Sequence, residues 1–125
     1  MACGQAIEGT ANLVEIFSSV QGEGPHVGET TLFVRFGECD LRCRWCDSPH
    51  TWRRAESCRV EAGRGSGAHE TLPNPVALSR AIAACEALGV REHRFASLTG
   101  GEPLLQPAAV KALAAALRER GTRVL

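Results

Sequence analysis

Apolar residues along the chain fall into short runs that predict strands and into periodic stretches that predict helices. Strands are expected at residues 12–20 and 30–36, where apolar residues are frequent and closely spaced. A mostly apolar run is typical of a strand covered on both faces, so we expect the first strand to be buried on both sides. Two more strands are expected at residues 94–99 and 122–125.

Helical spacing of apolar residues occurs at residues 76–88 and 107–120. Asn74 as N-cap and Pro75 in the first turn predict where the first helix begins, and Gly89 predicts where it ends. Strands that alternate with helices predict parallel β/α units. The expected fold class is therefore α/β, a partial barrel that is truncated because its last strand stops after four residues.

Residues 53–74 show neither the apolar runs of a strand nor the apolar spacing of a helix, and they are rich in Arg, Gly, Ser and Glu. We predict a long variable loop here, which would be either functional or disordered. Cys58 within it is expected to be a free thiol rather than a fourth metal ligand, and His69 is expected to be solvated. Cys85 falls on the apolar stripe of the first helix and is expected to pack as a small apolar side chain.

Composition narrows the class of protein. The length of 125 residues predicts one domain, and 14 Lys and Arg balance 14 Asp and Glu. No sustained basic face is visible, so neither a nucleic-acid nor a membrane partner is expected. No run approaches the ~20 apolar residues that span a bilayer, and the N-terminus lacks signal-peptide features. A cytoplasmic location is expected, where the six cysteines would be metal ligands or free thiols.

The most specific chemical feature is a loop with cysteines at CxxxCxxC spacing, formed by Cys39, Cys43 and Cys46. Three thiolates can hold three irons of a 4Fe–4S cluster and leave the fourth iron open for a small molecule. A structural zinc site that adds His50 is a second interpretation. Three inert buried thiols are a third, and the spacing alone leaves all three open.

Two glycine-rich segments and one arginine are further candidates. Residues 21–28 are either a flexible loop or a loop that approaches a ligand closely, with Gln21 and Glu23 as polar contacts. Arg35 near the end of a strand forms either a salt bridge or a clamp for a substrate carboxylate. Gly100 and Gly101 form either a strand-to-helix turn or a ligand contact.

Each of these loops follows a predicted strand. In α/β barrels ligands bind at the carboxyl ends of the strands. We therefore expect residues 21–24, the cysteine loop and the segment at 99–102 to converge on one end of the barrel and to form a single site.

Three stretches together resemble a known enzyme family. They are Glu-Ile-Phe-Ser-Ser-Val-Gln-Gly-Glu-Gly at 15–24, Phe-Val-Arg at 33–35, and Cys-x-x-x-Cys-x-Trp-Cys-Asp-Ser at 39–48. With Gly-Gly-Glu-Pro at 100–103, they resemble the 7-carboxy-7-deazaguanine synthases of the radical S-adenosylmethionine (SAM) superfamily. The similarity runs from about residue 13 to 52 and resumes near 94. The family's fold is a partial (β/α), TIM-like barrel of radical SAM type, so the resemblance implies that residues 1–125 are its N-terminal half.

The resemblance also implies roles for individual residues. The 4Fe–4S cluster would be held by Cys39, Cys43 and Cys46. SAM would be bound by Trp45, Cys46, Asp47, Gly101 and Glu102. Mg²⁺ would be bound by Ser48, where many members carry Thr. The substrate would be bound by Val20, Gln21, Gly22, Glu23, Arg35 and Thr99.

The implied activity is the conversion of 6-carboxy-5,6,7,8-tetrahydropterin to 7-carboxy-7-deazaguanine and ammonia in the queuosine pathway. A radical derived from SAM would abstract hydrogen from the pterin, whose ring then contracts, and SAM would be regenerated. The implied partners are this small molecule, an electron donor such as flavodoxin or ferredoxin, and, by analogy with the family, a second copy of the chain. Alternatives are a glycyl-radical activase, an electron-transfer protein that does not use SAM, or a zinc-stabilised binding module. Made alone, these 125 residues are expected to be insoluble or inactive.

Overall fold

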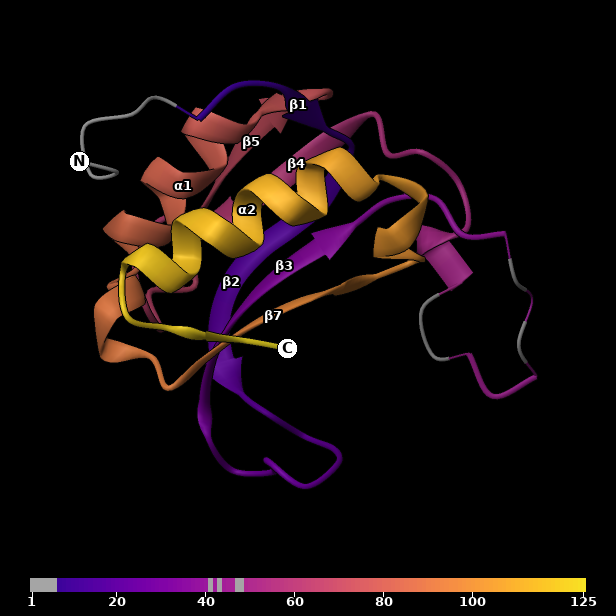
Figure 1. Ribbon diagram of the computed structural model, residues 1–125. Coiled ribbons are helices and arrows are strands. Elements are labelled where there is room, and N and C mark those ends of the chain that lie inside the picture. The colour runs from indigo at the N-terminus through magenta and orange to yellow at the C-terminus, as the bar shows by residue number, and fades with distance from the viewer. Residues whose placement is uncertain (1–6, 41, 43, 47–48) are drawn as a thin grey trace.

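A six-stranded sheet forms the frame of the molecule, and two helices pack on one of its faces (Figure 1). The structure, a computed structural model, describes residues 7–40, 42, 44–46 and 49–125. In sheet order the strands are β5 (His69–Pro73), β4 (Ser57–Glu61), β2 (Leu13–Val20), β3 (Thr30–Phe36), β7 (Phe95–Gly100) and β8 (Arg123–Val124).

The remaining elements connect and cover this sheet. The helices are α1 (Leu78–Ala87) and α2 (Pro107–Glu119), with short 3-10 turns η2 (Pro49–Thr51), η3 (Val90–Glu92) and η4 (Pro103–Leu105). A separate ribbon pairs β1 (Thr10–Ala11) with β6 (Val76–Ala77). Among the described residues, neither helix is long and apolar enough to cross a bilayer.

The sheet is mixed rather than parallel. Strands β3, β7 and β8 are parallel neighbours, and α1 and α2 lie in their connections as predicted. In contrast, β2 runs antiparallel to β3, and β4 runs antiparallel to β5. Strands β2 and β4 are parallel, so two of the five strand pairings depart from the prediction of parallel β/α units. The reason is that the connection between β2 and β3 is too short for a crossover, which needs about a dozen residues or more.

The long loop predicted at 53–74 is wrong as well, because β4 and β5 form a hairpin there at the edge of the sheet. Alternation is its sequence signal: Cys58 and Val60 are buried, whereas Ser57 and Arg59 are exposed. The signal is weak because the two apolar positions lie among arginines, glycines and serines. Cys58 is a free thiol and His69 is exposed, as expected.

The first helix begins at Leu78, later than predicted, and Asn74 does not cap it. The Asn74–Pro75 bond is cis, and the Asn74 side chain instead bonds the backbone of β2. Asn is favoured at helix starts because its amide can bond backbone groups. Here the Asn74 amide bonds the backbone of Leu13 in β2 instead of the start of α1. The predicted end of this helix near Gly89 is confirmed, as are α2, β3 and β7 to within a residue or two.

The two faces of the sheet differ in character. The face under α1 and α2 carries fully buried apolar side chains from every central strand, including Ile16, Leu32, Val34, Val60 and Ala96. A register shift between Leu13 and Glu15 lets Leu13 share this core with Ile16. Burial of such side chains stabilises the fold by about 1.5–3 kcal/mol each for the larger ones.

Alternation places Glu15 and Phe17 of β2, Phe33 and Arg35 of β3, and Thr99 of β7 on the opposite face, hereafter the open face. All five are half-buried, and no helix among the described residues covers them. The expectation that the first strand is covered on both sides is therefore wrong for this structure.

Candidate functional site

The cysteine loop leaves the sheet directly after β3 and returns to its own starting point. Backbone hydrogen bonds close it, from the Glu38 N–H to the Arg53 carbonyl at 3.1 Å and from the Cys39 N–H to the Trp52 carbonyl at 3.2 Å. Cys39 and Cys46 are free, half-buried thiols on this loop. Three other predicted site residues, Cys43, Asp47 and Ser48, lie outside the described residues.

Arg42 and Trp52 brace the interior of the loop. The Arg42 guanidinium donates to the Cys39 carbonyl at 2.7 Å and lies 4.6 Å from the centroid of the Trp52 ring. This cation–π contact joins the middle of the loop to its returning segment. Trp45, predicted to contact SAM, is 84% exposed and so presents its ring to solvent.

The Gly-Gly-Glu-Pro segment lies against the base of the cysteine loop, on the right in Figure 1. The Gly101 N–H donates to the Phe36 carbonyl at 3.0 Å, and the Glu102 N–H donates to the Glu38 carbonyl at 2.8 Å. These bonds prolong the parallel pairing of β3 with β7 into both loops. The Glu102 carboxylate also accepts the Leu104 N–H at 2.9 Å and caps η4.

Neither interpretation offered for Gly100 and Gly101 anticipated this contact. A Cβ at Gly101 would lie 2.2 Å from the Glu38 carbonyl oxygen, and one at Gly100 would lie 2.3 Å from the Phe36 carbonyl oxygen. Gly100 also has a φ of +122°, which side chains rarely adopt. Glycine is thus required at both positions because the backbone of the cysteine loop's base leaves no room for a Cβ. This requirement holds whether or not a ligand also contacts them.

The glycine-rich loop at 21–29 lies at the other end of the sheet. It is a hairpin connection, closed by the Gly28 N–H to the Gln21 carbonyl at 2.8 Å. Val20 pairs with Thr30 beside it, whereas Leu13 pairs with Phe36 beside the cysteine loop. The prediction that all three loops converge is therefore wrong, and only the cysteine loop and the Gly-Gly-Glu-Pro segment meet (Figure 1). Val20, Gly22 and Glu23 are exposed, and Gln21 is half-buried.

The open face carries a charged pair beside two aromatic rings. Arg35 Nε donates to Glu15 Oε2 at 3.0 Å, and the Arg35 guanidinium lies 5.9 Å from the centroid of the Phe17 ring. The rings of Phe17 and Phe33 stack with centroids 5.0 Å apart. Thr99 is the register partner of Arg35 on β7. The salt bridge predicted as one option for Arg35 is confirmed, and its role as a carboxylate clamp stays a prediction.

Sequence reasoning missed Glu15 as the partner of Arg35. It lies within the stretch that resembles the synthases, but its partner is evident only from the antiparallel register of β2 and β3, which pairs Glu15 with Arg35. A flat aromatic surface next to a guanidinium can hold a planar ligand that carries a negative charge.

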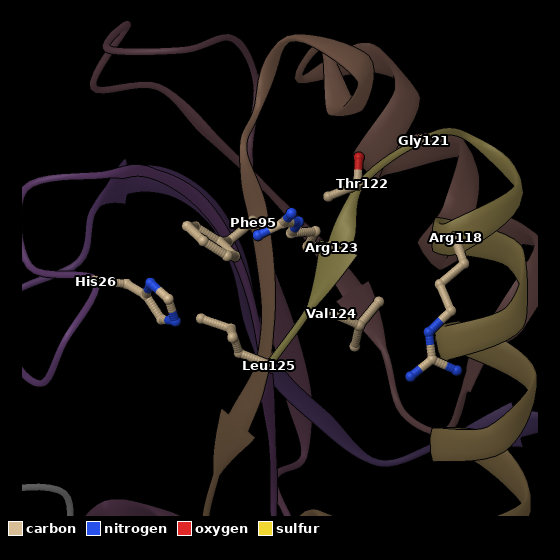
Figure 2. A pocket seen from close by; sticks show the side chains of 8 residues that line it. All are labelled: His26, Phe95, Arg118, Gly121, Thr122, Arg123, Val124 and Leu125. Carbon is tan, nitrogen blue, oxygen red and sulfur yellow. The ribbon is translucent and has the colours of Figure 1, made fainter.

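A cavity of about 530 Å³ lies away from the cysteine loop, at the start of β7 and along β8. Figure 2 shows His26, Phe95 and Leu125 gathered around it, with Arg118 on the α2 side. The centroids of the His26 and Phe95 rings are 4.3 Å apart, so the loop at 21–29 packs against the beginning of β7. The cavity contains none of the predicted site residues.

The cysteines outside the motif that the structure describes differ in exposure from Cys39 and Cys46. In the part of the chain that the structure describes, no group of three His, Cys, Asp or Glu side chains is placed to hold a metal ion. Cys58 and Cys85 are fully buried in the core. Burial raises the pKa of each thiol to about 12, so both stay protonated at neutral pH.

We therefore predict that Cys58 and Cys85 resist alkylation in the native protein. Treatment of apo-protein with iodoacetamide near pH 8, followed by peptide mass spectrometry, is expected to label Cys39 and Cys46 and to spare the two buried thiols, because only the thiolate reacts. The same treatment in urea serves as the control and should label all four. Labelling of Cys58 as fast as Cys39 without denaturant would contradict the prediction.

Comparison with known proteins shows which protein family this chain resembles. A protein-family profile described as a 4Fe-4S single cluster domain matches residues 20–124. The 7-carboxy-7-deazaguanine synthase of Methanopyrus kandleri is 47% identical over 118 residues, which cover 91% of this chain and 46% of that protein. The synthase of Geobacter sulfurreducens is 45% identical over 101 residues, which cover 77% of this chain and 39% of that protein.

The fold has a counterpart among solved structures. The crystal structure of QueE from Escherichia coli matches 92% of this chain and 50% of that chain, with a TM-score of 0.68 and 23% identity. The mixed α/β architecture is thus shared with that protein. The chain spans about half the length of these relatives. The profile match over most of its residues establishes that the chain belongs to the family of 4Fe-4S single cluster domains.

Proposed function

We propose that this chain forms the N-terminal half of a radical SAM lyase that converts 6-carboxy-5,6,7,8-tetrahydropterin to 7-carboxy-7-deazaguanine and ammonia. The observation that carries the proposal is the 47% identity to the Methanopyrus kandleri synthase over 91% of the chain. By the same reasoning, β3, β7 and β8 with their helices would be the first β/α units of the family's partial barrel.

The described residues fit an iron–sulfur cluster chemically. Cys39 and Cys46 are unpaired and partly exposed, whereas Cys58 and Cys85 are sealed in the core. Thiolates are the usual ligands of such clusters, and with Cys43 the loop would supply three. When bound, the cluster and SAM would supply a one-electron reduction and a carbon radical that abstracts hydrogen from the substrate.

The chain's own residues would bind and orient the pterin. Stacked Phe17 and Phe33 offer an apolar surface for a flat ring system, and Arg35 would pair with the substrate carboxylate. Thr99, next to Arg35 in the register, would add a hydroxyl contact. Glu15 would hold the Arg35 guanidinium through Nε and so fix its plane.

The predicted substrate contacts of the loop at 21–29 would lie apart from the cysteine loop. Seven residue steps of an antiparallel pair, roughly 20 Å, separate this loop from the cysteine loop. Any contact of Val20, Gln21, Gly22 or Glu23 with the substrate would therefore be made away from the cluster.

Further elements of the proposal rest on the resemblance alone. They are SAM contacts of Trp45, Asp47, Gly101 and Glu102, Mg²⁺ at Ser48, a one-electron donor such as flavodoxin or ferredoxin, and a cytoplasmic, dimeric enzyme. Mg²⁺ prefers oxygen ligands and keeps several waters, so one serine hydroxyl together with substrate oxygens is a chemically consistent site.

A chimera tests the function. This chain replaces the matched N-terminal region of the Methanopyrus kandleri relative, and the protein is reconstituted anaerobically with iron and sulfide. Incubation with SAM, a reductant and the pterin acid is expected to yield 7-carboxy-7-deazaguanine, detected by mass spectrometry, while the chain alone yields none. A chimera that holds a cluster with a SAM-dependent EPR change but forms no product would contradict the assignment of the pterin acid as substrate. A colourless protein that retains zinc would contradict the cluster.

A further inference from the structure

Two short backbone segments join the cysteine loop to the rest of the fold, Gly37 on the outgoing side and Ala55 on the returning side. Both are bound by Asn12, which is 3% exposed. Its carbonyl accepts the Gly37 N–H at 3.0 Å. Its side chain accepts the Ala55 N–H at 2.8 Å and donates to the Ala55 carbonyl at 2.9 Å. One residue therefore holds both sides of the loop's base.

The Gln106 side chain connects the segment after Gly-Gly-Glu-Pro to the same base of the cysteine loop. Gln106 is the residue directly before α2. Its side-chain oxygen accepts the Asn12 N–H at 2.8 Å, and its side-chain nitrogen is 3.2 Å from the carbonyl oxygens of both Asn12 and Gly37. The outgoing side of the cysteine loop is thereby fixed to the beginning of α2, beyond the contacts made by the glycines.

Asn74 completes the arrangement from the other side. Its side-chain oxygen accepts the Leu13 N–H at 2.9 Å, and its side-chain nitrogen donates to the Leu13 carbonyl at 2.8 Å and to the Ala55 carbonyl at 3.1 Å. The hairpin of β4 and β5 is thus connected to the returning side of the loop. The Ala55 carbonyl receives hydrogen bonds from two amides, Asn12 and Asn74.

We propose that Asn12, Asn74 and Gln106, here called the amide clamp, are positioning residues that hold the two sides of the cysteine loop at the separation the cluster requires. The proposal rests on the proposed function, because it assumes that this loop binds a cluster. None of the three belongs to the cysteine motif. Each uses its amide both as donor and as acceptor toward backbone groups, which a carboxylate cannot do. Support of this kind sets how well ligands are preorganised for a metal group.

The test compares isosteric variants of the clamp with a matched variant far from the loop. Asn12→Asp and Gln106→Glu keep the shape of the side chain but remove the N–H donors. Thr122→Val is the control, because Thr122 is 3% exposed and donates to the Val90 carbonyl at 2.9 Å, at the end of β8 opposite the cysteine loop. All are reconstituted with iron and sulfide in the full chain, and iron release to a chelator is timed alongside urea unfolding.

The clamp variants are expected to release iron about tenfold faster than wild type, whereas Thr122→Val stays within about twofold despite a comparable loss of stability. Equal release rates in Gln106→Glu and Thr122→Val would overturn the proposal. If Asn12→Asp does not fold, Gln106→Glu at its half-buried position carries the comparison.

Amide hydrogen exchange on the wild-type apo-protein gives a second measurement that needs neither variants nor iron. The Gly37 and Ala55 N–H groups are expected to exchange as slowly as the central strands, because the clamp exists before metal binds. Exchange as fast as in the exposed loop at 21–29 would overturn the proposal. A wild-type chain that binds no iron would end the cluster assignment, and the exchange rates would still decide whether the loop's base is preformed.

Discussion

Replacing Gly100 with alanine is expected to lower the free energy of unfolding by about 3–5 kcal/mol, and to abolish stable iron binding. Two costs add at this position. A φ of +122° is sparsely populated by residues with a Cβ, at about 1–3 kcal/mol, and overpacking adds about 1–3 kcal/mol. The clash cannot be relieved by a side-chain rotation, because the atoms 2.3 and 2.5 Å away are the Phe36 backbone oxygen and nitrogen.

Two other glycines separate these costs. Gly121 has a φ of +82° with nothing within 4 Å, so Gly121→Ala is expected to cost only about 1–2 kcal/mol, for backbone strain alone. Gly101→Ala lacks the strained φ but meets the Glu38 and Thr51 carbonyls, which lie on the two sides of the cysteine loop. It should lower iron content more than Gly121→Ala at a similar loss of stability. Urea unfolding and iron analysis measure both, and a Gly100→Ala protein as stable as Gly121→Ala would refute the account.

The elements that could be predicted from the sequence are those whose apolar pattern is local. Strands β3 and β7 and helix α2 agree with the prediction within a residue or two, because a short apolar run or a 3.6-residue period does not depend on what the element packs against. The hairpin of β4 and β5 was missed because its local apolar pattern is weak. Its alternation rests on Cys58, Val60 and Leu72 alone, and the exposed positions carry residues that are equally typical of loops.

Strand direction could not be predicted from local pattern. Residues 12–20 and 30–36 are both apolar, and nothing in either run says which way its neighbour points. Direction depends on the length of the connection, and an antiparallel pair places the loop after β2 and the loop after β3 at opposite ends of the sheet. The error about one strand therefore became an error about the site, in which the loop at 21–29 was expected beside the cysteines.

The cysteine motif and the Gly-Gly-Glu-Pro segment were placed together correctly because both come directly after parallel strands that are neighbours. The contacts that hold them together could not be found from the sequence. Asn12 and Gln106 are separated by 94 positions, and an amide in a loop or at a helix start is ordinarily explained by local capping. The partner of a buried amide depends on the tertiary structure.

Replacing Arg35 with methionine is expected to weaken binding of the carboxylated pterin about 100-fold, and to change binding of an analogue without the carboxylate less than about threefold. Loss of a charge-assisted, bidentate contact in a half-buried site costs roughly 2–5 kcal/mol, and about 2.7 kcal/mol corresponds to about 100-fold in affinity. Binding is measured by equilibrium dialysis with the reconstituted chimera. If both ligands were weakened equally, Arg35 would have a structural role only.

The same substitution also leaves the Glu15 carboxylate without its ion-pair partner. A double variant separates the resulting loss of stability from the loss of binding. Arg35→Met leaves the Glu15 carboxylate, 3.0 Å from the lost Nε, half-buried without its cation, which should cost about 1–3 kcal/mol of stability. Adding Glu15→Gln removes the stranded charge and is expected to restore most of the stability measured by urea unfolding. It cannot restore affinity for the carboxylate, because the Arg35 guanidinium is still absent. Recovery of both properties in the double variant would mean that the pair serves the fold alone, and that the substrate carboxylate is held elsewhere.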